Sequence, residues 1–128
     1  MTMAELVRTA CEKGVGALMV TDEAGNLAGI VTERDVMRLC NKGVDFKNVK
    51  AREVMIKHIV TVSPEEEINA AMDLMIKHKI RHLPVVTGNE LHGLITVRDL
   101  LYAMRKADQD EIKCLVEYLQ SNVELLNE

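Results

Sequence analysis

The chain of 128 residues has few aromatic side chains, no long apolar run and no excess of basic charge. Aromatic residues make up only 2% of the chain, with no Trp, and they are Phe46, Tyr102 and Tyr118. Proteins that bind single-stranded nucleic acid stack its bases on aromatic rings, so this function is disfavoured and the core must be aliphatic. Because no apolar run is long enough for a signal peptide or a membrane span, we expect a soluble, cytoplasmic protein with no membrane partner.

Basic residues are not in excess, and the net charge is unevenly distributed. Residues 108–128 hold six acidic side chains against Lys113, a net charge of −5, and because the whole chain carries −4, the remainder carries +1. A protein that binds duplex nucleic acid normally shows a broad basic face. We therefore expect no nucleic-acid partner.

Cysteine is also rare: Cys11, Cys40 and Cys114 make an odd count without CxxC spacing. Such usage is typical of buried thiols in a reducing compartment rather than of disulfides. The hydrophobic fraction of 48% is enough to build a core in a chain of this length.

A repeated segment organises the chain. The sequence GIVTERDVMRL, residues 29–39, aligns with GLITVRDLLYA, residues 93–103, at an offset of 64. Upstream, VGALMV (15–20) aligns with IRHLPV (80–85) at an offset of 65, and the slip of one residue falls in two turns rich in Gly and Asn. The identical pairs are Leu27 and Leu91, Gly29 and Gly93, Thr32 and Thr96, Arg34 and Arg98, and Asp35 and Asp99.

Each repeat is predicted to fold as helix, strand, turn, strand and helix. In the second repeat, Ser63-Pro64-Glu65-Glu66 is a helix-start signal followed by an apolar stripe at helical spacing. In the first repeat, Gly43 is placed to end the last helix. The predicted helices are 3–13, 33–42, the helix that starts at 63–66, and 97–105; the predicted strands are 17–20, 27–31, 82–86 and 91–95.

Two segments lie outside this symmetry. Residues 59–62 are predicted to form a strand ahead of the second repeat, and the first repeat has no counterpart, so it is either shortened at its start or functions without that strand. At the other end, apolar residues at helical spacing predict an amphipathic helix, which packs on the body of the protein or offers a surface to a partner. The expected organisation is a first repeat at 1–43, a connector with a short helix at 44–58, a second repeat at 59–106 and the last helix at 107–128.

The repeated motif Gly-h-h-Thr-x-Arg-Asp, where h is apolar, lies at a strand-to-helix junction. One reading is structural, because the Thr and Asp of each copy form a capping box. That reading leaves Arg34 and Arg98 unexplained, since a cation is unfavourable at a helix N-terminus unless it faces an anion. A guanidinium suits a phosphate and the carboxylate of Asp35 or Asp99 suits the two hydroxyls of a ribose, so the motif favours a nucleotide.

A second basic cluster, Lys77 to His82, supports this interpretation. Arg81 and His82 should be drawn toward the interior by the apolar segment that follows, whereas the equivalent positions of the first repeat, Gly16 and Ala17, carry no charge. His78 and His82 could be a metal pair, but the helix should end between them and no third ligand is evident. No catalytic motif is present, so we expect neither an enzyme nor a required cofactor.

With both motifs, KGVGALMV, KIRHLPVV and the lead-in VMIKHIVTVSPEEEINAAM, residues 2–106 resemble a tandem pair of the CBS domain family, named for cystathionine β-synthase and also called a Bateman module. The resemblance implies a mixed α/β (α+β) fold of two β-α-β-β-α units related by a pseudo-twofold axis, with the predicted helix after them. It also implies a regulatory module with two clefts between the sheets, which in many members bind AMP, ADP, ATP or S-adenosylmethionine.

The resemblance implies residue roles. Asp35 and Asp99 would hold the ribose, with Thr32 and Thr96 beside them; Arg81 and His82 would contact phosphate, and Ile59, Val60 and Thr61 would face adenine. Because the first repeat lacks that strand and the basic pair, we expect one working site, centred on Asp99.

The resemblance also implies a homodimer through the helices, which would bury the face of Met72 and Met75. We expect any signal to pass through a partner protein. The alternatives are a ligand-free assembly module and, less favoured by the charge, a nucleic-acid binder.

Overall fold

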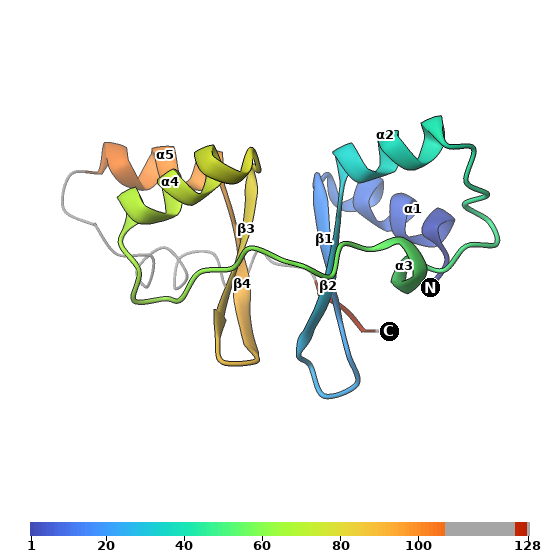
Figure 1. Ribbon diagram of the computed structural model, residues 1–128, viewed down its shortest axis with the longest axis horizontal. Helices are drawn as coiled ribbons and strands as arrows, with labels where there is room; N and C mark the ends of the chain where they lie inside the picture. Colours follow the sequence, from blue (N-terminus) through green and yellow to red (C-terminus); the bar gives the residue numbers. More distant parts are fainter. Residues whose placement is uncertain (107–124, 128) are drawn as a thin grey trace. The chain divides into compact units, whose positions relative to one another are not determined.

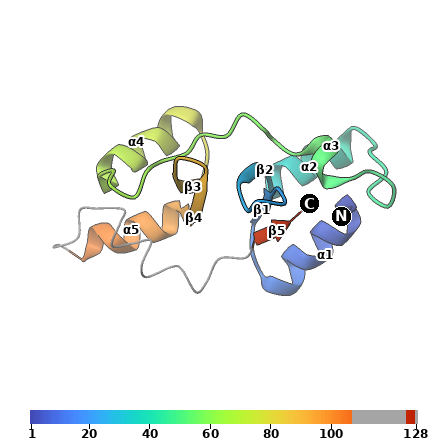
Figure 2. The same cartoon turned by 90° about the horizontal axis from the view of Figure 1, so that it is seen from below.

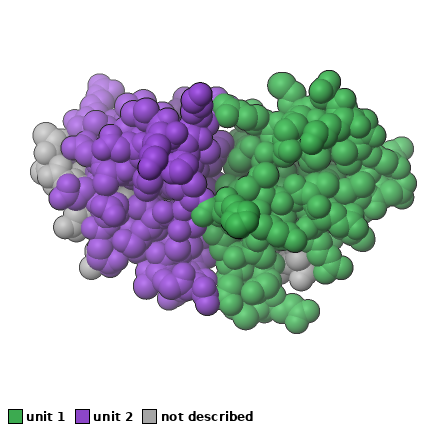
Figure 3. Space-filling view, viewed as in Figure 1, with its two compact units in different colours: residues 1–59, 124–128 green, residues 60–123 purple. Residues whose placement is uncertain are grey.

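The computed structural model describes residues 1–106 and 125–127 and divides the chain into two compact units. The first unit comprises residues 1–59 and 124–128, and the second comprises residues 60–123 (Figure 3). The connector expected at 44–58 therefore belongs to the first unit. Mixed helix and strand, as expected, make up both units (Figure 1).

The first unit contains α1 (Met3–Lys13), β1 (Ala17–Thr21), β2 (Leu27–Thr32), α2 (Glu33–Asn41) and α3 (Ala51–Val54). Helix α1 begins where the Thr2 hydroxyl accepts a hydrogen bond from the Glu5 amide at 3.2 Å, and it ends at Gly14 in the left-handed conformation. Beyond α3, Ile56 exchanges two 3.0 Å backbone hydrogen bonds with Ile30 of β2. The connector is thus tied to the first sheet.

The second unit contains α4 (Ile68–His78), β3 (His82–Thr87), β4 (Glu90–Thr96) and α5 (Val97–Arg105). Helices α4 and α5 lie side by side and both contact the hairpin (Figure 2). The start predicted for α4 at residues 63–66 is wrong: these residues form a turn, with the Glu66 amide 3.1 Å from the Ser63 carbonyl. The helix begins at Ile68, the first buried residue of its apolar stripe, so burial sets its start.

The sequence repeat is also a structural repeat. Ala17 pairs with Thr32 across the antiparallel strands β1 and β2, and the equivalent His82 pairs with Thr96 across β3 and β4. Both hairpins change register at the same place, after Val20 in one and after Val85 in the other. The two hairpins therefore present equivalent residues at equivalent ends.

The segment 59–62 does not form the strand that we expected. Val62 makes a single parallel bridge to Val85, donating its amide to Pro84 at 3.0 Å and accepting from Val86 at 2.9 Å. The chain turns immediately afterwards at Pro64, which has no amide hydrogen, so the pairing stops after one residue. Residues 59–61 before it are not part of a strand.

A short strand, β5 (Leu125–Asn127), pairs in parallel with β1 and gives the first sheet the order β2-β1-β5. The helix predicted over 107–128 is therefore wrong for these three residues, and the rest of that prediction lies outside the described residues. Pairing with β1 supplies backbone partners at the edge of the sheet, which favours the extended conformation there. Leu126 lies beside Val20 as Val62 lies beside Val85, its equivalent.

Each unit has its own core. Among the described residues the buried apolar side chains are aliphatic or Met, as the scarcity of aromatics predicts. Helix, hairpin and connector residues make the first core, and the stripe of α4 packs with the second hairpin and α5. The first core comprises Met3, Leu6, Leu18, Val31, Leu39 and Ala51; the second comprises Val62, Ile68, Ala71, Met75, Leu83, Val85, Ile95, Leu100 and Ala103.

Two expectations about burial are wrong. Met75 is only 1% exposed and Met72 packs against the same core, so these residues do not form an outward face. Cys11 and Cys40 are exposed free thiols, because each lies just beyond the buried stripe of its helix, and Cys114 lies outside the described residues.

Candidate functional site

Both repeated motifs lie where a strand leads into a helix, and in both the Thr and the Asp form a capping box. The Thr32 hydroxyl accepts from the Asp35 amide at 3.4 Å, and Asp35 Oδ2 accepts from the Thr32 amide at 2.9 Å. The same bonds in the second unit are 3.1 Å to Thr96 and 2.8 Å to Asp99 Oδ2. Capping thus uses one carboxylate oxygen of each Asp and leaves the other.

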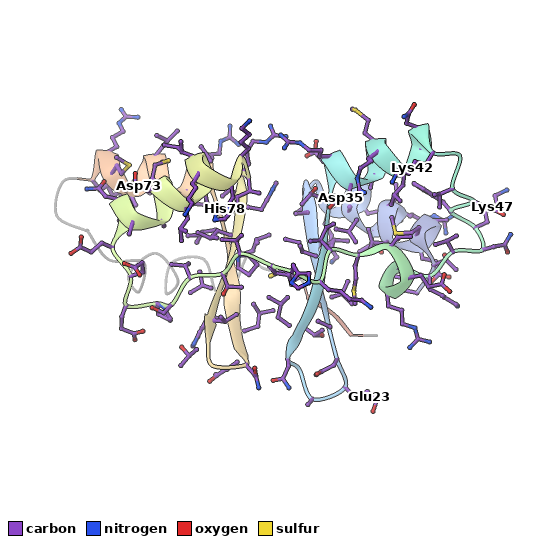
Figure 4. The ribbon with its side chains drawn as sticks, in the orientation of Figure 1. Glu23, Asp35, Lys42, Lys47, Asp73 and His78 are labelled. Atoms are coloured by element: carbon purple, nitrogen blue, oxygen red, sulfur yellow. The ribbon has the colours of Figure 1, made fainter. Side chains whose placement is uncertain are left out.

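The second carboxylate oxygen distinguishes the two units. Asp35, labelled at the beginning of α2 in Figure 4, binds Arg38 through Oδ1, at 3.3 Å from Nη2. The residue equivalent to Arg38 in the second unit is Tyr102. Among the described residues, none donates a hydrogen bond to Asp99 Oδ1. Asp99 Oδ1 thus differs from Asp35 Oδ1 in having no donor in the described part of the chain.

The N-termini of α2 and α5 share one backbone hydrogen bond but differ in the charge beside it. The Glu33 amide donates to the Gly16 carbonyl at 2.9 Å, and the equivalent Val97 amide donates to the Arg81 carbonyl at 3.1 Å. A Cβ atom on Gly16 would collide with the Glu33 carboxylate, which therefore lies directly over this glycine. A negative charge in the first unit thus lies where the second unit has an arginine and a valine.

The basic residues of the second unit gather at one end of its hairpin. His82 begins β3 and pairs with Thr96, and Arg81 precedes it. His82 is half-buried, but Arg81 is exposed, contrary to the expectation that both turn inward. Arg81 lies before the strand, so the sheet does not bury it. Arg34 and Arg98 are exposed in the first turns of α2 and α5.

The segment expected to face adenine lies before Val62. Ile59, Val60 and Thr61 are half-buried, and Val60 packs against the second core. The division of the chain falls inside this segment, so Val60 and Thr61 share a unit with Asp99 and Ile59 belongs to the first unit.

The candidate metal pair is separated, as expected. Helix α4 ends at His78, and the chain turns through Lys79 at φ 55° before His82 begins β3. In the described parts of the chain, no three His, Cys, Asp or Glu side chains are grouped so that they could hold a metal ion.

Glu33 and Arg38 were not predicted as site residues from the sequence. Both lie in the first copy of the motif segment, and neither belongs to a pair that is identical between the copies. The signal that could have found them is the difference between the copies: Glu33 against Val97 and Arg38 against Tyr102.

Comparisons with known proteins place the chain in a family. The family model described as "CBS domain" matches residues 1–42 and 51–106, and the chain belongs to this family.

Over residues 1–106 and 125–127, we find no helix with the length and apolar character needed to cross a membrane.

Relatives and solved structures extend the comparison. A mitochondrial CBS-domain protein of Arabidopsis thaliana is 33% identical over 124 residues, which cover 93% of this chain and 60% of the relative. The chain spans less than two thirds of the length of this and three other similar curated relatives.

Two solved structures share the fold. A protein of Burkholderia ambifaria, described as a signal-transduction protein with CBS domains, has a TM-score of 0.76 and is 34% identical to this chain. The match covers 85% of this chain and 80% of the other. A CBS domain protein of Pyrobaculum aerophilum, complexed with AMP, has a TM-score of 0.71 and 25% identity, covering 83% and 86%.

Proposed function

We propose that this chain is a regulatory module that binds an adenosine compound at the second unit and signals through a partner. The single observation that carries the proposal is the carboxylate of Asp99, which caps α5 with one oxygen and leaves the other without a partner among the described residues. The AMP bound to the Pyrobaculum aerophilum neighbour supports the ligand class.

The chemistry follows from the groups at this end of the hairpin. Asp99 Oδ1 accepts hydrogen bonds from the ribose hydroxyls, as carboxylates do in dinucleotide-binding folds. The N-terminus of α5 favours an anion, and Arg81, Arg98 and His82 supply cationic or hydrogen-bonding groups. Thr96 lies beside the ribose. This charge favours a phosphorylated ligand, AMP, ADP or ATP, over S-adenosylmethionine.

The remaining contacts are assigned to the segment before Val62. Ile59, Val60 and Thr61 face the adenine ring in this proposal, and the half-buried apolar side chain of Val60 suits a flat aromatic base.

The signal passes through a homodimer or an effector protein. The apolar residues Ile76, Leu101 and Met104 are exposed on α4 and α5 and replace Met72 and Met75 as the surface proposed for the dimer.

Isothermal titration calorimetry with AMP tests the proposal. Asp99→Asn keeps an oxygen for the Thr96 amide but removes the charge, and we expect it to weaken AMP binding by about tenfold to a hundredfold, the effect of one hydrogen bond to a charged group. Asp35→Asn makes the same change in the other capping box and should leave the affinity unchanged. Loss of binding in Asp35→Asn alone would place the ligand in the first unit.

The alternative is a ligand-free assembly module. It is favoured by the capping boxes, which account for Thr and Asp in both motifs without a ligand. Thermal unfolding with AMP, ATP and S-adenosylmethionine in turn separates the two functions. A ligand at a hundred times its Kd adds about 2.7 kcal/mol to the free energy of unfolding, a Tm increase of several degrees. No shift with any of the three would support assembly.

A further inference from the structure

The two units share one frame, and three of the differences between them change the charge around the motif. Gly16, Glu33 and Arg38 of the first unit are replaced in the second by Arg81, Val97 and Tyr102. One backbone hydrogen bond at this place is the same in both units, since Glu33 and Val97 each donate an amide to the residue just before the first strand of the hairpin. These differences therefore change the charge at the site and keep this backbone hydrogen bond.

Glu33 changes the electrostatics of the helix N-terminus. The first turn of α2 carries the carboxylates of Glu33 and Asp35, whereas the first turn of α5 carries only Asp99. The Glu33 carboxylate lies over Gly16, beside the amides that would otherwise favour an anion. In water, two like charges 4 Å apart repel by an amount that lowers affinity about fivefold. A phosphate is therefore disfavoured there.

Arg38 opposes binding of the ribose part of the ligand. It binds Asp35 Oδ1, the oxygen that corresponds to the unpartnered Oδ1 of Asp99. The Arg38 side chain is 44% exposed, so the pair lies near the surface and a ribose would have to displace the guanidinium to reach the carboxylate. The two residues thus oppose the phosphate and the ribose separately.

We propose that Glu33 and Arg38 are specificity-determining residues that close the first unit to phosphorylated nucleosides. This inference rests on the proposed function, in that the second unit is taken as the binding one. The first unit then keeps the capping box for its fold, and the chain binds one nucleotide.

A gain-of-function graft tests this assignment. The background is Asp99→Asn, in which the second unit binds AMP weakly, and the graft adds Gly16→Arg, Glu33→Val and Arg38→Tyr, the residues of the second repeat. Calorimetry with AMP should show that the graft raises affinity at least tenfold over the background. Adding Asp35→Asn to the graft should remove the gain, because the new site needs that carboxylate.

Two smaller variants keep the test decisive if the graft does not fold. Glu33→Gln and Arg38→Ala change exposed side chains, and in the Asp99→Asn background each should raise AMP affinity, about fivefold for Glu33→Gln, with the gain shrinking at high salt. No gain in folded variants would overturn the inference. Two AMP molecules bound to the wild type would overturn it as well, whereas no binding by the wild type would overturn the proposed function instead.

Discussion

The first and second units are built on the same hairpin register and the same capping boxes, and they differ in what surrounds the capping Asp. Asp35 is bound by Arg38 and flanked by Glu33, while Asp99 has neither neighbour. The comparison teaches that the Thr–Asp pair belongs first to the fold, because it stabilises a helix start in both units. In the function proposed here, ligand binding depends on residues that differ between the two copies of the repeat.

The largest effect is expected in the two cores. Leu18 and Leu83 occupy equivalent positions and are 1% and 0% exposed. Replacing either by Ala should lower the free energy of unfolding by about 2–5 kcal/mol, through lost burial and the cavity left behind. Urea unfolding followed by circular dichroism measures it. Met37→Ala, at a residue 75% exposed, is the control and should stay within about 0.5 kcal/mol. A small loss in only one Leu variant would show that the units do not have equivalent cores.

The N-terminal caps of α2 and α5 give the next comparison between the two units. Thr32→Ala and Thr96→Ala each remove the hydroxyl that accepts an amide hydrogen bond at a helix start, which should cost about 1 kcal/mol each. Thermal unfolding of the two variants beside Thr32→Ser and Thr96→Ser, which keep the hydroxyl, isolates the cap. A much larger loss for one of them would mean that its Thr does more than cap.

Substitutions at the C-terminal ends of α1 and α4 should change the stability of the protein in opposite directions. The equivalent residues Gly14 and Lys79 both have positive φ, at 66° and 55°, and Lys79 is the only non-Gly residue of this kind among those described. Since only Gly adopts this conformation without strain, Lys79→Gly should stabilise the protein by about 0.5 kcal/mol, and Gly14→Ala should destabilise it by about 1 kcal/mol. Chemical denaturation can resolve both. A destabilised Lys79→Gly would mean that the lysine side chain outweighs its backbone strain.

The smallest effect belongs to the Arg38–Asp35 ion pair. Because it is partly exposed, Arg38→Ala should lower the free energy of unfolding by less than about 0.5 kcal/mol, and the difference should vanish in 1 M NaCl. A salt-independent loss above 1 kcal/mol would make this pair a structural element rather than a competitor for the ligand.

Much of the fold was predictable because the repeat is local. Helices α1 and α5 and both hairpins lie within a residue or so of the predicted bounds, since apolar periodicity, Gly and Thr–Asp act over a few residues. The errors arise where distant segments meet. Strand β5 pairs with β1 across most of the chain length, and the single bridge at Val62 depends on an edge that periodicity does not reveal.

The candidate site was predictable to the same extent. Identity between the copies pointed to Thr96, Arg98 and Asp99 and their first-unit equivalents, and their role in binding stays a prediction. It could not identify Glu33 and Arg38, because these residues matter by differing from their counterparts. The lack of a donor to Asp99 Oδ1 among the described residues also depends on the folded structure, since sequence alone does not show which side chains reach that oxygen.

The most direct test of the account is the number of AMP molecules bound per chain at saturation, measured by equilibrium dialysis on the wild-type protein. The asymmetry of Asp35 and Asp99 predicts one. Two molecules per chain, or one that persists unchanged in Asp99→Asn, would contradict it.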